Sequence, residues 1–513
     1  MTSVRLLKNG LLRQNALNYN RRNYQLTTSN AKMANSEQVK LKSIEDIPGP
    51  EKLPLVGNVL EYLKHEKKQH LWFQELQQKY GDIIKLEMGL GPTLIYVFSP
   101  EYAKAMCKAD GPVPDNFGFE NFQWYRNIRK KDQYPNGQAG IIGSYLPIWR
   151  EVRTAVNPVM ARKNSATDYL EDLNGVASKC IDRIAEKRDA NNEIHNAIPD
   201  VVYLWALEGM TKIFLDANLG FLDKEMDSKC KEWVAHAKEV AEGITEMQRS
   251  LPLWKYMDVS LYKKFDKASD YIYHESSVLV NEAITRLKET KENEGRKSMI
   301  AKLVDTFGED SYIPVVMALD AILAGMDTTA FTASYLLQNL ARNPIKQEKA
   351  IEEIDKVTGG GIITAKQFDQ LRYLKACFKE SIRMTPATNG TARRLTQDVV
   401  MGEYLLPKGT QVIQLGYVIG NNPKYFPEPH KYMPERWLRG DSGRQDTHPF
   451  AFIPFGFGPR ICIGKRIAET EVVLLAAKML QRFRMEYHHE PVGFSFASVN
   501  QPDRDMRIEL FER

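Results

Sequence analysis

Cysteine is scarce in this sequence of 513 residues, which has only five, at positions 107, 180, 230, 377 and 462. No two of them are spaced as CxxC, and none forms a CxxH motif. Such scattered cysteines argue against a disulfide framework, a zinc site of paired cysteines and a covalently attached haem. We therefore expect reduced thiols in an intracellular compartment.

Acidic residues are absent from the first 36 positions, and the first acid in the chain is Glu37. The same stretch carries six Arg and Lys residues, and removing those six charges from the formal net charge of +5 leaves about −1 for the rest. The basic excess thus belongs to this leader, and a nucleic-acid partner is not indicated. An acid-free basic leader with hydroxyl residues is typical of a mitochondrial transit peptide, and a basic tail without a targeting role is the alternative. We predict a transit peptide over residues 1–36 and a linker over residues 37–44.

Long apolar runs are missing from the leader, where none approaches the ~20 residues needed to span a bilayer. Repeats and low-complexity linkers are missing from the body of the chain, which begins at a Pro/Gly-rich segment over residues 47–58. Local patterns predict strands at residues 82–86 and 93–97 and helices over most of residues 145–385. We expect an α+β fold, mainly α with small β-sheets, in one domain over residues 45–513.

The strongest chemical signal is the ten-residue stretch from Phe455 to Gly464, FGFGPRICIG. A metal-binding thiolate needs backbone N–H donors around its sulfur, and flanking glycines let the chain lie close to a flat ligand. A helix predicted from Lys465 to about Phe483 would direct its positive end at Cys462, which favours the thiolate. A buried, inert thiol is the ordinary role of a lone cysteine, so the whole loop carries the prediction.

This stretch resembles the haem-binding loop of the cytochromes P450, since it has the Phe, both early Gly, the Arg, the Cys and the final Gly of that loop. The resemblance implies that Cys462 is the axial ligand of the iron of haem b and that Arg460 pairs with a haem propionate. It also implies that Phe455 and Gly464 contact the cofactor. An axial thiolate donates electron density that favours cleavage of the O–O bond of dioxygen. The P450 fold, a single large triangular domain, is the fold that the resemblance implies.

A second motif, ESIR at residues 380–383, places an acid and a base three residues apart on a predicted helix. Alone, this spacing predicts only an exposed ion pair. In P450 proteins such a pair is completed by an Arg from a later segment, and PERW at residues 434–437 supplies one in the expected order. The resemblance implies that Glu380, Arg383 and Arg436 form a structural triad on the haem side of the core.

A glycine interrupts the long helix predicted over residues 311–340, within the hexapeptide AGMDTT. Gly325 weakens the helix, and the hydroxyl of Thr328 can compete for the carbonyl of Ala324 and open the helix to oxygen and water. A tolerated glycine and polar pair in an exposed helix is the alternative. The hexapeptide is similar to the AGxDTT pattern of P450 proteins, which implies that Asp327 and Thr328 relay protons to dioxygen at the haem.

Two further matches complete the haem-binding residues that the resemblance implies. Trp149 and Arg153 have the WxxxR spacing of the family, and Arg393 follows Pro386 by the expected seven residues. Each match is commonplace by itself. Together with Arg460, these residues would bind the two propionates, whose charges need paired donors when buried.

Three basic residues predict the electron donor. Lys375 and Lys379 lie four residues apart on the helix before Glu380, matching two positions by which mitochondrial P450 proteins recognise ferredoxin, and Arg466, beside Lys465, matches a basic pair after the ligand loop. A positive surface would steer an acidic partner toward the thiolate, and a solvated charged face is the alternative. The resemblance implies the mitochondrial class, reduced by a [2Fe-2S] ferredoxin and its NADPH-dependent reductase.

The sequence therefore predicts a haem-thiolate monooxygenase that inserts one atom of dioxygen into an apolar substrate. The residues expected to line the pocket, 117–125 and 318–322, suit a sterol, another lipid or a xenobiotic. The resemblance also implies peripheral association with the matrix side of the mitochondrial inner membrane. The alternatives are a haem-thiolate isomerase or dehydratase without dioxygen, against which Asp327 and Thr328 count, and a non-catalytic haem-binding protein.

Overall fold

The computed structural model describes residues 41–89, 91–134, 140–144, 148–162, 164–195, 197–249, 252–257, 259–290, 298–309, 311–438, 440, 446–495 and 498–513. The predicted leader and the first half of the predicted linker lie outside the described residues. The rest forms two compact units. The smaller unit holds residues 41–47 and 400–406, and the larger unit holds the described residues of 48–399 and 407–513. All residues predicted at the site belong to the larger unit.

The smaller unit contains a short 3₁₀ helix, one whole strand and two residues of a second strand. In η1 (Ile44–Asp46), Asp46 accepts a hydrogen bond from the Ser43 amide (2.7 Å), which caps the helix. Lys42 bridges in parallel to the first residue of β6 (Tyr404–Leu406) and pairs with Glu403 (2.9 Å). Strand β5 (Val399–Met401) forms a two-stranded sheet with β6.

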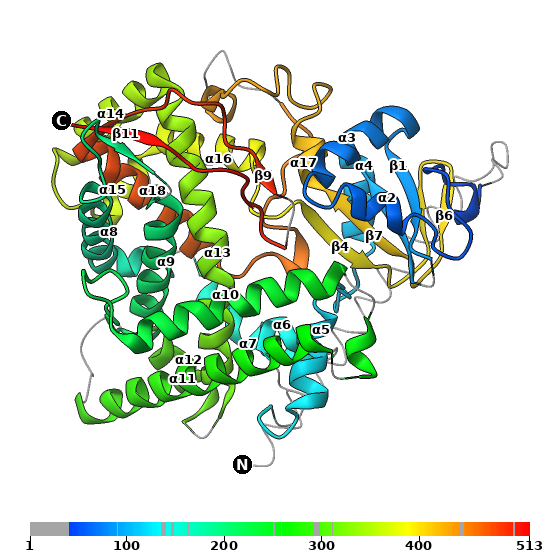
Figure 1. Cartoon of the computed structure of the whole chain (residues 1–513), viewed down its shortest axis with the longest axis horizontal. Helices are drawn as coiled ribbons and strands as arrows, with labels where there is room; N and C mark the ends of the chain where they lie inside the picture. Colours follow the sequence, from blue (N-terminus) through cyan, green and yellow to red (C-terminus); the bar gives the residue numbers. More distant parts are fainter. Residues whose placement is uncertain are drawn as a thin grey trace, which may run out of the picture. The chain divides into compact units, whose positions relative to one another are not determined.

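The larger unit is mainly helical, as the sequence predicted (Figure 1). Its longer helices are α2 (Val59–Lys64), α3 (Gln69–Tyr80), α4 (Pro100–Lys108), α7 (Ile148–Met160), α8 (Leu170–Ala185), α9 (Ala197–Leu215), α10 (Ser228–Arg249), α11 (Ser260–Thr290), α12 (Met299–Phe307), α13 (Ile313–Ala341), α14 (Pro344–Thr358), α15 (Ala365–Gln370), α16 (Arg372–Met384) and α18 (Lys465–Arg482). Shorter ones are α5 (Glu120–Trp124), η2 (Tyr125–Arg129), α6 (Gly140–Gly143), η4 (Thr167–Tyr169), η5 (Pro252–Lys255), α17 (Gly416–Gly420), η6 (Pro434–Trp437) and η7 (Gly458–Arg460).

Helix α13 is the central helix of the larger unit. Figure 1 shows it running through the helical part, and it packs against α9, α11, α16 and α18. Its 29 residues are apolar on most sides, and a helix of that kind is stable in water only when other elements cover it. Of the helices in the described ranges, α13 alone is long and apolar enough to cross a membrane, yet 72% of its most apolar window is buried. Burial on this scale identifies a core helix.

Small sheets accompany the helices. The largest has the order β1-β2-β7-β4, built from β1 (Ile83–Glu87), β2 (Thr93–Val97), β7 (Gln411–Leu415) and β4 (Gly390–Arg394), with β2 and β7 parallel and the other neighbours antiparallel. An antiparallel sheet of order β3-β11-β8 joins β3 (Glu193–Ile194), β11 (Ile508–Glu512) and β8 (Phe483–Glu486), and β9 (Phe494–Ser495) pairs with β10 (Gln501–Pro502). The predicted fold class, mainly α with small sheets, is confirmed, as are the strands expected at residues 82–86 and 93–97.

Candidate functional site

The ligand loop closes on itself through one backbone hydrogen bond, from the Cys462 amide to the Phe455 carbonyl (2.8 Å). Gly456 and Gly458 have φ angles of 73° and 70°, which residues with a Cβ rarely adopt. The expected helix follows at once, because α18 begins at Lys465 with Gly464 as its N-cap. The loop therefore presents Cys462 just before the first turn of a helix.

Opposing influences act on the Cys462 sulfur. Burial is the largest and raises its pKa, while the backbone amides of Gly464 and Lys465 and the charge of Arg153 lower it. The residue is nonetheless accessible to solvent. A metal cation at the sulfur would deprotonate it outright, so this thiol fits a metal ligand.

The predicted haem-binding arginines lie near one another. The pKa of Arg460 is lowered to about 9, first by burial and then by the positive charges of Arg393 and Arg153. The guanidinium of Arg460 also stacks on the ring of Trp149, 3.5 Å from its centroid. Two buried donors of this group, Trp149 Nε1 and Arg153 Nε, have no hydrogen-bond partner in the described part of the chain. Mutually repelling cations with open donors fit an anionic ligand, and the propionates of haem b supply that charge.

Protein oxygen atoms that the sequence did not predict hold these arginines in place. Arg393 Nε donates to Asp110 Oδ2 (2.8 Å), and both side chains are buried. Arg153 Nη2 donates to the carbonyl of Ile461 (2.6 Å), next to the ligand cysteine. Arg460 Nε donates to the carbonyl of Pro114 (3.0 Å). The cationic cluster is thereby tied directly to the ligand loop.

Glu380 is a fully buried carboxylate that accepts hydrogen bonds from two arginines. Arg383 binds both of its oxygens (2.9 and 3.0 Å), and Arg436 Nε binds Oε1 (3.0 Å). The Trp437 indole and the Met433 amide donate to the same carboxylate (2.9 and 3.1 Å). The structure thus brings the predicted triad together and adds two donors that sequence reasoning missed, although Trp437 directly follows Arg436.

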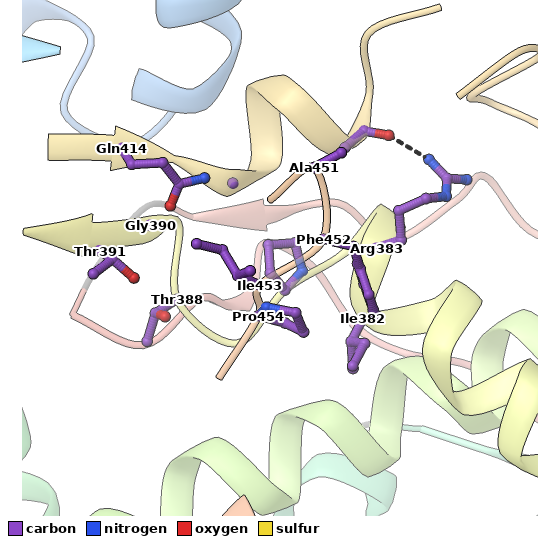
Figure 2. Close-up of a pocket in the computed structure, with 13 residues that line it drawn as sticks. Ile382, Arg383, Thr388, Gly390, Thr391, Gln414, Ala451, Phe452, Ile453 and Pro454 are labelled. Carbon is purple, nitrogen blue, oxygen red and sulfur yellow. Dashed lines mark hydrogen bonds between the residues drawn. The ribbon is translucent and has the colours of Figure 1, made fainter. Parts of the chain in front are cut away.

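Backbone carbonyls accept hydrogen bonds from further guanidinium donors of this triad. Arg383 donates to the carbonyls of Gly420 (2.7 Å, the dashed line in Figure 2) and Pro429 (2.8 Å). Arg436 donates to the carbonyl of Pro427 (3.2 Å). Buried guanidinium groups need such partners, because each unpaired donor would cost free energy of desolvation. The triad therefore joins α16 and η6 to the chain between residues 420 and 429.

A cavity of about 30 Å³ lies beside Arg383 and borders residues 451–454, which lead into the ligand loop. Figure 2 shows Gln414 reaching over it from β7 and Thr388 and Thr391 from the opposite side. The Gln414 Nε2 donor is buried without a hydrogen-bond partner among the described residues. A space of this size with an open donor suits a water molecule and is too small for a substrate.

The predicted relay residues lie on α13. Thr328 Oγ1 donates to the carbonyl of Ala324 (2.7 Å), as the sequence predicted. The predicted opening of the helix was wrong, because α13 runs from Ile313 to Ala341 without interruption. A carbonyl has two lone pairs, so it can accept a hydroxyl while the helix continues. Gly325 is explained by packing instead, since a Cβ there would lie 2.8 Å from the sulfur of Met210 on α9.

Asp327 is buried at 8% exposure and has a raised pKa of about 6, because burial disfavours its charged form. The charge of Lys238, an exposed residue of α10, partly offsets this effect. Lys238 also lies over the ring of Tyr203, 5.1 Å from its centroid, and Asp327 in turn helps to raise the Tyr203 pKa. Asp327 is thus electrostatically linked to an exposed cation on a neighbouring helix.

A buried ion pair that sequence reasoning missed joins η2 to α13. Arg126 Nη1 donates to Asp320 Oδ1 (2.5 Å), and both side chains are almost fully buried. Asp320 also accepts from the Ile142 amide (3.1 Å), and the Arg126 guanidinium lies over the Phe122 ring, 4.0 Å from its centroid. The pair is separated by 194 residues in sequence, which leaves no local pattern to reveal it. It fixes Arg126, which directly follows one of the two segments expected to line the substrate pocket, against Asp320 of the other.

The three predicted partner-binding residues differ in their surroundings. Lys375 is only 20% exposed, pairs with Asp369 (3.8 Å) and lies over the Phe368 ring. Burial lowers the pKa of Lys375, although nearby acids that include Glu469 of α18 act in the opposite direction. Lys379 is half-buried on the next turn of α16, and Arg466 on α18 is exposed. Since Glu469 lies one turn after Arg466, the three cations belong to adjoining parts of α16 and α18.

Comparison with known proteins identifies the family. The sequence model of the family "Cytochrome P450" matches residues 47–504. The "Probable cytochrome P450 12a5, mitochondrial" of Drosophila melanogaster is 32% identical over 498 residues, which are 92% of this chain and 92% of that protein. The "Cytochrome P450 CYP12A2" of Musca domestica is 30% identical over 492 residues, 91% of this chain and 90% of that protein. The "Probable cytochrome P450 49a1" of Drosophila melanogaster is 29% identical over 500 residues, 94% of this chain and 85% of that protein.

The match covers nearly all of the chain and includes the loop, the arginine cluster and the buried triad described above. Relatives whose names mark them as mitochondrial are among the similar proteins, in agreement with the class that the sequence predicted. The chain belongs to the cytochrome P450 family of haem-thiolate monooxygenases, whose members hold haem b through a cysteine thiolate.

Proposed function

We propose that this protein is a ferredoxin-dependent mitochondrial monooxygenase that hydroxylates an apolar small molecule, such as a sterol, another lipid or a xenobiotic. The observation that carries the proposal is the Cys462 loop. Two amides and the Arg153 charge lower the pKa of its sulfur, and Arg153, two further arginines and a tryptophan form a group suited to two carboxylates. When bound, haem b supplies dioxygen activation, which thiolate donation promotes. NADPH consumption that depends on an apolar substrate, in a system reconstituted with ferredoxin and its reductase, tests the proposal. Consumption without any oxygenated product would contradict it.

The chain's own residues divide the work in this proposal. Cys462 holds the iron, and Trp149, Arg153, Arg393 and Arg460 orient and neutralise the carboxylates of the cofactor. Helix α13 contributes Ala318 and Ile322, both buried, to the apolar surface expected around the substrate. Burial raises the pKa of Asp327 to about 6, so this carboxyl can take up and release a proton close to neutral pH, and the Thr328 hydroxyl hands protons on.

Asp327→Asn is expected to lower kcat by at least about tenfold, since positioned proton transfer contributes about 10² to 10⁴ in rate. Burial raises the pKa of Asp327 to about 6, so the protonated, donating form declines as pH rises above that value. In the wild type, kcat for a step limited by proton delivery therefore falls above about pH 6. The variant should lack this limb when kcat is measured across about pH 5 to 8.

A matched control comes from the same helix. Ser334 Oγ donates to the Ala330 carbonyl (2.9 Å), the same kind of bond that Thr328 makes. Thr328→Ala is expected to release more hydrogen peroxide per product, whereas Ser334→Ala should not. Equal peroxide yields in the two variants would remove Thr328 from the relay.

Electrons are proposed to arrive over α16 and α18. Reversing Lys379 and Arg466 to Glu is expected to raise the apparent Kd for ferredoxin at least about tenfold at low salt, since each contact contributes about 1 kcal/mol. The difference from wild type should shrink as salt is added, because screening weakens steering. Lys375 is expected to contribute less to docking than Lys379, since Asp369 and Phe368 already hold it.

The control for charge is Lys263→Glu, at an exposed position on α11. Figure 1 shows α11 well apart from α16 and α18. Ferredoxin should reduce this variant at the wild-type rate, and that rate should depend on salt as it does in the wild type. If the double reversal at Lys379 and Arg466 behaves like Lys263→Glu, the two cations are only a solvated face.

We also propose that the protein associates peripherally with the matrix side of the mitochondrial inner membrane. Six large apolar side chains between residues 53 and 71 are exposed, and Leu55 is the most exposed of them at 84%. They are Leu53, Leu55, Val56, Leu60, Leu63 and Leu71. Exposed apolar side chains with exposed lysines in the same stretch of chain, here Lys64 and Lys67, suit the surface of an anionic membrane.

Residues 1–36 fused to a reporter should direct the reporter to mitochondria, and a cytosolic reporter would contradict the targeting. Alkaline carbonate should extract the full protein from the membrane, and a protein that resists extraction would contradict the peripheral association.

A further inference from the structure

The solvent-facing side of the β3-β11-β8 sheet carries a row of three glutamates. Glu509 of β11 lies directly opposite Glu193 of β3 and Glu486 of β8. Directly opposed residues point to the same face of a sheet, and the other face holds buried apolar residues such as Ile508 and Leu510. Like charges directly opposite each other destabilise a sheet, so each carboxylate needs a positive partner.

Glu193 has such partners. The guanidinium of Arg507 pairs with its Oε2, His489 binds its Oε1, and His195 Nε2 lies 3.1 Å from Oε2. A metal at Glu193 would have to compete with the Arg507 cation for the same oxygen. The two remaining carboxylates of the row, Glu486 and Glu509, form no ion pair with an arginine in the described ranges.

His488 is the ion-pair partner that Glu486 and Glu509 share. Its Nε2 lies 3.0 Å from Glu486 Oε2 and 4.0 Å from Glu509 Oε1. The three potential ligand atoms all lie within 4.8 Å of one another. Within the described ranges, no Lys or Arg comes within ion-pair distance of either carboxylate. The side chains are 42%, 25% and 62% exposed for Glu486, Glu509 and His488, so a hydrated ion can reach them.

We propose that Glu486, His488 and Glu509 form a binding site for a divalent transition-metal ion, with Zn²⁺ as the best-matched occupant. Two carboxylate oxygens and one imidazole nitrogen are ligands that Zn²⁺ accepts at three protein positions, with water at the fourth. Ca²⁺ and Mg²⁺ prefer sets made only of oxygen, and the imidazole disfavours them. The bound ion neutralises the opposed glutamates and clamps the C-terminal strand β11 to β8. Because β8 begins at the residue after α18 ends, the clamp secures the far end of the helix that follows the ligand loop.

Calorimetric titration of the haem-loaded full chain with Zn²⁺ tests the site. The wild type should show a saturable component of one ion per chain. His488→Ala should lower the Zn²⁺ affinity of this component at least about tenfold, because loss of a metal ligand weakens binding no less than loss of a hydrogen bond that supports a ligand. His236→Ala is the matched control, because His236 lies 3.1 Å from one carboxylate, Glu239, and belongs to no group of three ligands in the described chain. The Soret spectrum should stay unchanged in both variants and so shows that they are folded. A wild type without a saturable component, or the same affinity in His488→Ala, would overturn the proposal.

Glu509→Gln separates a metal site from an ordinary cluster of charges. Without metal, the variant should unfold at a higher temperature than the wild type, because the opposed charges are gone. Added Zn²⁺ should raise the unfolding temperature of the wild type but not that of the variant, since only a protein that binds the ion is stabilised by it. If Zn²⁺ shifts the two proteins equally, or shifts neither, Glu509 is no ligand and the proposal is wrong.

Discussion

Replacing Cys462 with serine is expected to abolish turnover and the red-shifted Soret band that the reduced carbon monoxide complex of a thiolate haem shows. Both readouts depend on a thiolate, because its electron donation to the iron sets the spectrum and favours O–O cleavage. A serine hydroxyl stays protonated in conditions where Cys462, with two amides and the Arg153 charge around it, can be held as an anion by a metal. The arginine cluster is untouched, so the variant should still bind haem to a measurable extent.

The matched control is Cys230→Ser. The thiol of Cys230 donates to the carbonyl of Leu219 (3.2 Å), and a serine hydroxyl can reproduce that bond. This variant should keep the red-shifted band and the wild-type turnover, which shows that a sulfur-to-oxygen change is harmless elsewhere. A red-shifted band in Cys462→Ser would remove Cys462 as the ligand and with it the observation on which the proposed function rests.

The ligand loop could be predicted in detail because its determinants are local. The positive φ angles of Gly456 and Gly458, the bond between Cys462 and Phe455, and the start of α18 after Gly464 all lie within ten consecutive residues. The glycines and the helix start have a signature in residue type and spacing, whereas the backbone bond between Cys462 and Phe455 has none of its own. The same holds for the bond from Thr328 to Ala324, which spans one helical turn.

Tertiary partners could not be predicted in the same way. Asp110 under Arg393, and Asp320 under Arg126, meet their arginines only after the chain has folded, across 283 and 194 residues. Backbone carbonyls such as those of Gly420 and Pro429 carry no sequence signal at all, since any residue has one. A motif therefore predicts which charged residue belongs to the site, but not which group neutralises its charge.

Gly325 and Lys375 show how a neighbouring element changes the meaning of a residue. Gly325 was expected to loosen α13, whereas Met210 of α9 occupies the space that a side chain there would need. Lys375 was expected to face a partner freely, whereas Phe368 and Asp369 enclose it. In both cases the contact that sets the role of the residue comes from another helix, α9 for Gly325 and α15 for Lys375.

Glu380→Gln is expected to destabilise the protein by about 3 to 5 kcal/mol, because it leaves two buried arginines without a counter-charge. Arg383, Arg436 and Trp437 all direct N–H donors at this carboxylate, and a glutamine would turn one of its two acceptors into a further donor. The loss is a large part of the roughly 5 to 15 kcal/mol that stabilises a typical domain. We expect a lower urea midpoint for the holoprotein and a lower haem content after expression, since α16 and η6 would separate.

Glu348→Gln provides the comparison, because Glu348 forms an arginine pair of similar length, 2.7 Å to Arg484, with both side chains about half exposed. Its loss should cost no more than about 1 kcal/mol, since water screens and replaces an exposed pair. The contrast compares a buried carboxylate that has several donors with an exposed one that has a single arginine, because residue type and substitution are the same in both variants. If Glu380→Gln unfolds at the same urea concentration as Glu348→Gln, the buried triad does not support the core, and the two arginines find other partners when Glu380 is neutralised.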